Sequence, residues 1–208
     1  MASGSGSGPS EPGADGEGAD PHDMAAASVF GDDIDDVLIG SDRIQQRLHE
    51  LAGEIERDYA GQRLLLVGVL KGAFMVMADL ARHLDLAVEI DFMAVSSYGS
   101  ATKTSGVVRI LKDLERDISG YHVLVVEDIV DSGLTLKYLL RNLAARHPQS
   151  LEVLALLVKP SSANYQLHVR YRGFEVPDVF VVGYGLDYAE RYRNLDCIAT
   201  LAPSVYSS

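Results

Sequence analysis

The sequence predicts an α/β fold in which a mostly parallel sheet is flanked by helices. Two observations predict this class. Apolar runs of strand length alternate with segments of helical periodicity along the chain. The run at 63–69 is almost entirely aliphatic, which is typical of a strand buried on both faces of a sheet. Sheets of this kind bind ligands at the carboxyl ends of their strands.

The expected elements follow in order along the chain. A helix is predicted over 41–57 with Ser41 as its N-cap, because apolar residues recur at helical spacing within it. The other expected elements are a strand at 63–69, a helix at 72–83, a strand at 88–97, a short strand at 107–111, a strand at 121–127, a helix at 132–146 and strands at 153–159 and 179–184.

The chain divides into a tail and one domain. Residues 1–27 are rich in Gly, Ser, Ala and acidic side chains, a composition that buries too little apolar surface to fold, so we expect a disordered acidic tail. Residues 28–208 are expected to form a single domain. Nine acidic and no basic residues occur in the first 36, which leaves 21 acidic and 18 basic residues in the rest. The absence of a long basic run argues against nucleic-acid binding.

Composition also limits the compartment and the metal chemistry. No stretch of the chain approaches the roughly 20 apolar residues of a membrane span, and the N-terminus lacks the pattern of a secretory signal. We therefore expect a cytoplasmic protein with no membrane partner. The single cysteine, Cys197, cannot form an internal disulfide, and the six histidines show no metal-binding spacing.

One segment carries the clearest chemical pattern. Two carboxylates, Glu127 and Asp128, end an apolar strand, and Ser132, Gly133 and Thr135 open the helix that follows. Backbone N–H groups and hydroxyls at such a helix start could bind a phosphate. The carboxylates could bind sugar hydroxyls or a hydrated Mg²⁺, which prefers oxygen ligands. The spacing alone fits equally well an acidic strand end before a capped helix.

This segment resembles the phosphoribosyl-pyrophosphate (PRPP) loop of type I phosphoribosyltransferases. In that family two acids, two aliphatic residues, Asp, Ser or Thr, Gly and a later Thr follow one another, and the match is complete. The similarity covers about residues 37–201 and is of the bacterial hypoxanthine-guanine type. It implies the type I phosphoribosyltransferase fold with a small hood region and a mobile lid loop. It also implies that Asp131 is the catalytic base, and that Asp131, Ser132, Gly133, Leu134 and Thr135 bind the phosphate of the phosphoribosyl group.

Two further motifs match the family in the same order. The turn at Leu70-Lys71-Gly72 follows the aliphatic strand, and the resemblance assigns Lys71 and Gly72 to pyrophosphate, often with a cis peptide bond in this turn. The stretch at 96–106 resembles the lid, in which Ser97 and Tyr98 close over the reacting centre. Such a lid would exclude water from a cation-like sugar.

The purine side of the site is implied by the last motifs. In the family a lysine at position 159 donates to the 6-oxo group, the ring of Phe180 stacks on the base, and Val181 offers backbone contacts. Asp187 is expected near the purine edge and a metal ion, and Arg193 on pyrophosphate. A buried donor such as Lys159 would disfavour adenine, whose 6-amino group cannot accept its hydrogen bond.

The resemblance therefore implies an enzyme of purine salvage. It would transfer 5-phosphoribosyl from PRPP to hypoxanthine or guanine, forming IMP or GMP and releasing pyrophosphate. Mg²⁺ is the expected cofactor, with Glu127, Asp128 and Asp187 as its expected ligands. Homo-oligomers, dimers or tetramers, are expected from the family's habit.

Two alternatives remain open from sequence. One is a phosphoribosyltransferase for another base, such as xanthine, adenine or uracil. The other is a regulatory protein that keeps the fold to sense nucleotides while binding DNA or RNA. The lack of a basic face and the presence of Asp131 argue against the second alternative.

Overall fold

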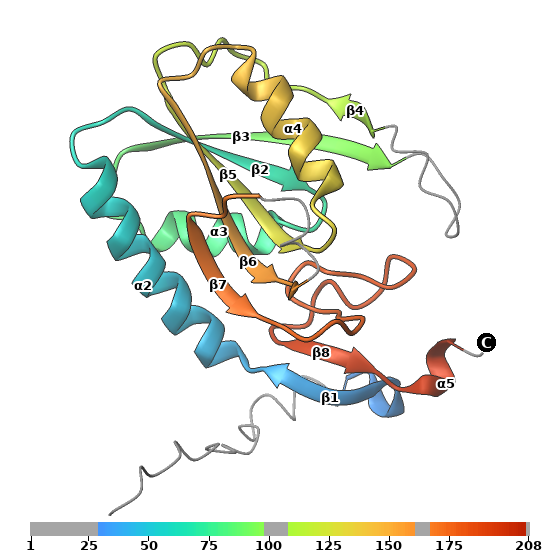
Figure 1. The fold of residues 1–208 in the computed structure, drawn as a ribbon. Coiled ribbons are helices and arrows are strands. Elements are labelled where there is room, and N and C mark those ends of the chain that lie inside the picture. The colour runs from blue at the N-terminus through green and yellow to red at the C-terminus, as the bar shows by residue number, and fades with distance from the viewer. Residues whose placement is uncertain (1–28, 98–107, 161–166, 207–208) are drawn as a thin grey trace, which may run out of the picture.

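The computed structural model describes residues 29–97, 108–160 and 167–206. A six-stranded sheet forms the centre of the molecule, with the strand order β4-β3-β2-β5-β6-β7 (Figure 1). Its strands are β2 (Leu64–Leu70), β3 (Val88–Ser97), β4 (Val108–Lys112), β5 (His122–Val130), β6 (Ser150–Val158) and β7 (Tyr171–Glu175). All neighbouring pairs are parallel except β3 and β4, which are antiparallel.

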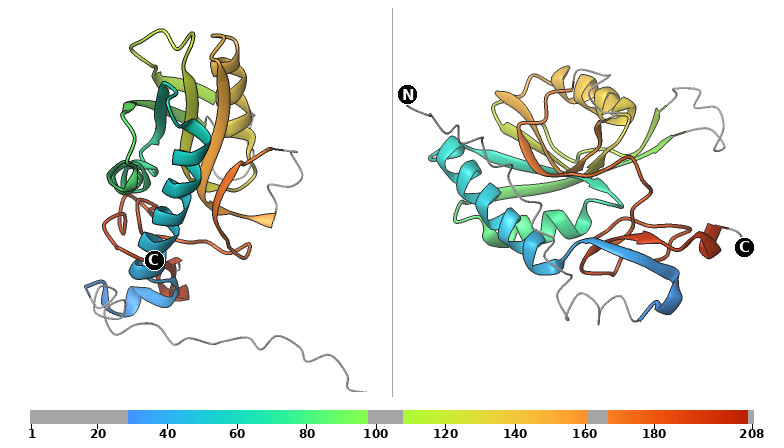
Figure 2. Two further views of the ribbon diagram at one scale, coloured as in Figure 1. Left: turned by 90° about the vertical axis from the view of Figure 1, so that its left-hand side faces the viewer. Right: turned by 60° about the horizontal axis from the view of Figure 1, so that its bottom comes forward.

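Helices cover both faces of this sheet, as Figure 2 shows from the side. They are α2 (Ser41–Tyr59), α3 (Phe74–His83) and α4 (Leu134–Ala144). Because successive strand residues point to opposite faces, β5 contributes to two apolar clusters. Leu124 and Val126 pack with α2 and α3, whereas Val123 and Val125 pack with α4.

A smaller unit lies beyond the carboxyl ends of the parallel strands (Figures 1 and 2). It contains the antiparallel pair β1 (Ile34–Ile39) and β8 (Ile198–Leu201), flanked by the short helices η1 (Gly31–Asp33) and α5 (Pro203–Tyr206). Its own apolar cluster includes Val182, Tyr192, Leu195, Cys197 and Ala199. This unit corresponds to the expected hood region.

Most of the predicted elements are present with bounds that differ by up to three residues, and three predictions that concern the site or its neighbours need correction. The N-cap of α2 is Gly40, with extended backbone, and Ser41 is the first helical residue. The strand predicted over 121–127 continues to Val130, so both acids lie within β5 and not at its end. The strand predicted over 179–184 is wrong, because Gly183 (φ +96°) and Gly185 (φ +101°) break the extended backbone and leave isolated bridges.

Three strands were not expected from sequence: β1, β7 and β8. The predicted tail and the lid residue Tyr98 lie outside the described residues. Among the described helices, none is both long and apolar enough to cross a membrane.

Candidate active site

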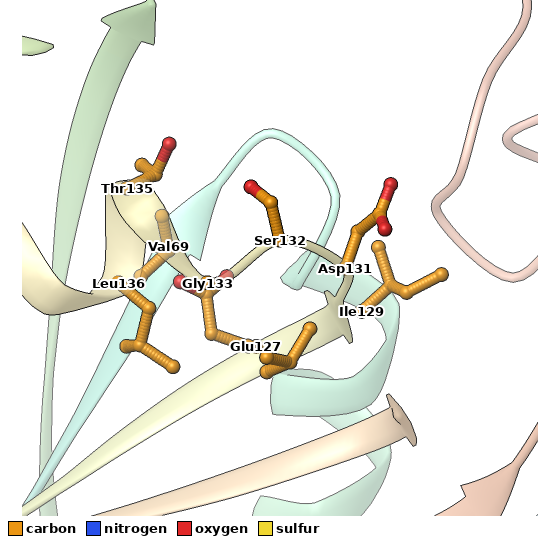
Figure 3. A pocket seen from close by; sticks show the side chains of 9 residues that line it. Val69, Glu127, Ile129, Asp131, Ser132, Gly133, Thr135 and Leu136 are labelled. Atoms are coloured by element: carbon orange, nitrogen blue, oxygen red, sulfur yellow. The ribbon is translucent and has the colours of Figure 1, made fainter. Parts of the chain in front are cut away.

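A cavity of about 200 Å³ lies where β5 passes into α4 (Figure 3). The chain turns between Val130 and Leu134, and Gly133, the N-cap of α4, adopts the left-handed conformation with φ +74°. Figure 3 shows the oxygens of Asp131, Ser132 and Thr135 pointing away from the strand on the same side. The residues that line the cavity are Val69, Glu127, Ile129, Val130, Asp131, Ser132, Gly133, Thr135 and Leu136. Hydroxyls and a helix N-terminus around one cavity favour an anion such as phosphate.

The side chains of the two consecutive acids of β5 point to opposite faces of the sheet. Glu127 lines the cavity on the α4 side and is 7% exposed. Burial, together with the charge of Asp128, raises the pKa of Glu127 well above its ordinary value. Asp128 lies on the α3 side, where burial raises its pKa to about 6 although the N–H of Ile129 donates to its Oδ1 at 2.8 Å. Placing both ionised carboxylates here is costly without cations or hydroxyl donors.

The turn after β2 approaches Asp128 very closely. The Leu70–Lys71 peptide bond is cis, as the resemblance led us to expect. A Cβ atom added at Gly72 would lie 1.6 Å from Oδ2 of Asp128, and one added at Gly185 would lie 2.0 Å from the carbonyl oxygen of Gly72. The absence of side chains at these two positions therefore allows the turn, β5 and the loop at 183–193, called the hood loop below, to meet.

Basic and acidic side chains gather beside this turn. Nζ of Lys71 lies 3.0 Å from Oε2 of Glu190, and Nη2 of Arg193 lies 2.8 Å from Oδ1 of Asp187 and 3.3 Å from Oε2 of Glu190. The charge of Arg193 also lowers the pKa of Asp128, against the larger effect of burial. The structure thus brings the predicted pyrophosphate residues Lys71, Gly72 and Arg193 together with Asp187.

A second group of side chains lies at the ends of β5 and β6. Lys159 is only 8% exposed, and its Nζ lies 3.7 Å from Oδ2 of Asp131 and 3.5 Å from Oδ1 of Asp178. The neighbouring Phe180 is half-exposed, whereas Val181 is buried. A buried cation can donate to an oxygen of a flat ring, and an accessible aromatic side chain can stack on such a ring.

The ring of Phe180 has aromatic neighbours on the hood. It meets Tyr188 edge-on at a centroid distance of 5.8 Å and Tyr206 at 6.1 Å. Phe180 stays half-exposed in spite of these contacts, so part of its ring is accessible for stacking.

Sequence reasoning missed two site residues, Asp178 and Glu190. Each pairs with a cation that was predicted, Asp178 with Lys159 and Glu190 with both Lys71 and Arg193. Glu190 precedes Arg193 by three residues, but the segment is not helical and has positive φ angles at Ala189, Glu190 and Tyr192, so this spacing gave no signal for the pair. Ser97 is the last residue of β3, and its expected partner Tyr98 is not among the described residues.

The donor set suits a magnesium ion that shares its coordination with substrate. Within residues 29–97, 108–160 and 167–206, no group of three or more His, Cys, Asp or Glu side chains could hold a metal by itself. Mg²⁺ usually takes only one or two carboxylates and completes its shell with water and substrate phosphates. Burial raises the pKa of both Glu127 and Asp128, so a bound cation would favour their ionised forms; the predicted ligands Glu127, Asp128 and Asp187 stay a prediction.

Comparison with known proteins agrees with this geometry. The phosphoribosyl transferase domain family matches residues 40–189. The hypoxanthine-guanine phosphoribosyltransferase of Mycobacterium avium is 55% identical over 186 residues, which cover 86% of this chain and 92% of that protein. The Bacillus subtilis enzyme of the same name is 51% identical over 176 residues, covering 85% and 98%. A hypoxanthine phosphoribosyltransferase structure from Staphylococcus aureus superimposes with a TM-score of 0.83 at 45% identity, covering 87% of this chain and 98% of that one.

Proposed function

The chain belongs to the phosphoribosyltransferase family, and from that premise we propose that it is a purine-salvage transferase of the hypoxanthine-guanine type. It transfers 5-phosphoribosyl from PRPP to hypoxanthine or guanine, giving IMP or GMP and pyrophosphate. In this reaction N9 of the purine forms a bond to C1′ of the ribose, the bond from C1′ to the pyrophosphate oxygen breaks, and the proton on N7 must be accepted.

One observation carries the proposal. The buried ammonium of Lys159 lies 3.7 Å from the carboxylate of Asp131, at the edge of the cavity formed by the β5–α4 turn. A purine whose O6 and N7 edge faces both groups offers its 6-oxo oxygen to Lys159 and its N7 proton to Asp131, because these two atoms lie side by side on one edge of the base. Asp131 then acts as the general base, because it lies within reach of the proton to be removed.

The remaining purine contacts come from the segment after β7. Phe180 offers its exposed ring for stacking, Val181 offers backbone groups, and Asp187 lies toward the other edge of the base. A buried ammonium discriminates against adenine, since a 6-amino group would leave the donor unpaired.

The phosphoribosyl group binds where β5 passes into α4. Its 5-phosphate binds at the start of α4, where Ser132, Gly133, Leu134 and Thr135 supply N–H groups and hydroxyls. Glu127 and Asp128 hold the ribose hydroxyls, and Lys71, Gly72 and Arg193 bind pyrophosphate. Lys71 and Arg193 both lie within 3.3 Å of the carboxylate of Glu190. This position therefore accommodates an anionic group even without substrate.

Mg²⁺ is the proposed cofactor, with Glu127 and Asp128 as proposed ligands beside the ribose and Asp187 as the proposed ligand of a second ion; water and substrate oxygens would complete each shell. When bound, it would neutralise charge on the departing pyrophosphate. The protein's own contribution is to bind and orient the two substrates and to hold Asp131 against the base. Ser97 and Tyr98 would close the site from water.

The cellular setting is also part of the proposal. We expect residues 28–208 to act as one domain, residues 1–27 to be a flexible tail, and the enzyme to work in the cytoplasm as a dimer or tetramer. The single domain is supported by relatives that match this chain over most of their own length.

The direct test is nucleotide formation by the purified protein with PRPP and Mg²⁺, each purine being supplied separately. We expect IMP and GMP to form and adenine to stay unconverted. Asp131→Asn should slow the reaction by about 10²-fold to 10⁴-fold, the usual contribution of a general base. Asp117→Asn, in an exposed turn, is the matched control and should be as active as the parent protein. Formation of AMP, or full activity of Asp131→Asn, would contradict the proposal.

A further inference from the structure

A polar network of Gln45, Asp79, His83 and Tyr184 joins α2, α3 and the hood loop. Nε2 of Gln45, on α2, donates to Oδ2 of Asp79, on α3, at 2.8 Å, and to the hydroxyl of Tyr184 at 3.1 Å. The Tyr184 hydroxyl donates to the same carboxylate oxygen of Asp79. Nε2 of His83 lies 3.1 Å from Oε1 of Gln45, which fixes the orientation of that amide.

The network is well sheltered from solvent. Tyr184 is 3% exposed, and the side chain of Asp79 is 14% exposed. Burial, with the hydrogen bond to Asp79, raises the pKa of Tyr184. Burial alone would raise the pKa of Asp79, but hydrogen bonds from Tyr184, Gln45 and Arg82 bring it below its ordinary value. Hydrogen bonds to a sheltered carboxylate are among the stronger ones in proteins.

Tyr184 is joined directly to the pyrophosphate side of the site. Its backbone is left-handed, with φ +48°, and its N–H donates to the carbonyl of Leu195 at 2.8 Å. The next residue, Gly185, lies against the carbonyl of Gly72, and its own carbonyl accepts a hydrogen bond from Nη1 of Arg193 at 2.8 Å. Fixing Tyr184 therefore fixes the loop that holds Arg193.

Asp79 is connected through helix α3 to the Lys71-Gly72 turn. It lies on α3, and α3 begins at Phe74, two residues after Gly72. The contact between Asp79 and Tyr184 therefore ties the helix that follows the Lys71-Gly72 turn to the loop that carries Gly185 and Asp187.

We infer that Asp79 and Tyr184 are positioning residues that set the distance between the Lys71-Gly72 turn and the Arg193 side chain, and so determine how tightly the enzyme holds the pyrophosphate group of PRPP. Neither residue touches substrate. Their effect passes through the contact of Gly185 with Gly72 and through the bond from Arg193 to Gly185. The inference rests on the proposed function, in which these groups bind pyrophosphate.

The chain offers a matched control for the hydroxyl of Tyr184. Tyr171, on β7, is also buried, and its hydroxyl donates to Oδ2 of Asp58 at 2.6 Å, at a different place on α2. Tyr184→Phe and Tyr171→Phe each remove one buried hydroxyl that donates to a carboxylate. A purely structural role would give both variants the same kinetics.

The first measurement is steady-state kinetics of both variants with PRPP and hypoxanthine. Tyr184→Phe should raise the KM for PRPP by about tenfold, the effect of one lost hydrogen bond to a charged group. The KM for hypoxanthine should change less than about twofold, because Lys159 and Phe180 are unaffected. Tyr171→Phe should leave both KM values unchanged. Equal KM values for PRPP in the two variants would overturn the inference.

The second measurement does not depend on activity. Hydrogen–deuterium exchange of the substrate-free protein should be faster in Tyr184→Phe at the amides of Gly185 and of Ala73, whose N–H groups donate to Arg193 and Val69. Tyr171→Phe should leave these amides as slow as in the parent protein. Unchanged exchange in Tyr184→Phe would overturn the positioning role. If the parent protein is inactive but exchange is faster in Tyr184→Phe, the proposed function is contradicted. The structural link between Tyr184 and the two amides is then still supported.

Discussion

Asp128→Asn should make the substrate-free protein more stable at neutral pH and at the same time impair its activity. Asp128 is largely surrounded by protein, close to Gly72, and burial raises its pKa from 3.8 to about 6. A carboxylate with a raised pKa disfavours the folded state whenever the solution pH keeps it ionised. Asparagine keeps the shape and can still accept the hydrogen bond from the N–H of Ile129.

The size of the effect follows from the two pKa values. Each pKa unit corresponds to about 1.4 kcal/mol, so ionised Asp128 lowers the free energy of unfolding by about 3 kcal/mol above pH 6. Below the unfolded value of 3.8 the group is protonated in both states and has no such effect. The contribution therefore grows as the pH rises from about 4 to 6 and is constant above that range. At pH 5 about half of it is present.

Urea unfolding at several pH values from 5 to 8, without Mg²⁺ or substrate, measures this difference. The stability gain of Asp128→Asn should be about 1.5 kcal/mol larger at pH 8 than at pH 5. Asp91→Asn is the control of opposite sign. Burial raises the pKa of Asp91, but three contacts outweigh it and the pKa is lowered overall. These contacts are hydrogen bonds from the N–H groups of Phe92 and Glu115 and the ion pair with Lys112. Asp91→Asn should therefore destabilise the protein. A loss of stability in Asp128→Asn at pH 8 would refute the reasoning.

Three further predictions concern other parts of the site. Lys159→Gln should reduce kcat/KM for hypoxanthine by about tenfold to 100-fold and make adenine use measurable, because an amide can accept as well as donate; parallel rates with both bases check this. Thr135→Val should raise the KM for PRPP by about tenfold without changing the KM for hypoxanthine, since it removes one hydroxyl from the start of α4; an unchanged KM for PRPP would remove Thr135 from the phosphate site. Gly185→Ala should lower the free energy of unfolding by more than about 2 kcal/mol, because its φ of +101° and the carbonyl of Gly72, 2.0 Å from the new Cβ, oppose the methyl group; thermal unfolding measures it, and Gly61→Ala, with nothing within 4 Å of the new atom, should cost less.

The parts of the fold that sequence predicted are those with a local signal. Strand β3 has the predicted bounds, and α2 follows the apolar repeat that includes Ile44 and Leu48. The β5–α4 turn is a candidate ligand site because its acids, small residues and hydroxyls are contiguous, and its resemblance to the PRPP loop favoured that interpretation over a capped helix. These features depend on neighbours within a few residues, which one sequence displays directly.

The parts that sequence missed depend on distant partners. Strand β1 carries Asp35 and Asp36 and acquires its order by pairing with β8, more than 150 residues later. The run at 179–182 is apolar enough for a strand, yet the positive φ angles of Gly183 and Gly185 turn the chain toward Gly72. The contact of Asp79 with Tyr184 joins residues 105 positions apart and has no local sequence pattern.

The central claim is that the site transfers a phosphoribosyl group to a 6-oxopurine, and the stoichiometry of that transfer tests it most directly. Hypoxanthine, PRPP and Mg²⁺ should be incubated with the full chain, and hypoxanthine, IMP and pyrophosphate measured in the same samples over time. The account predicts that one IMP and one pyrophosphate appear for each hypoxanthine consumed, and that neither appears when the purine is omitted. Pyrophosphate released without IMP would indicate hydrolysis of PRPP, and that result would contradict the account.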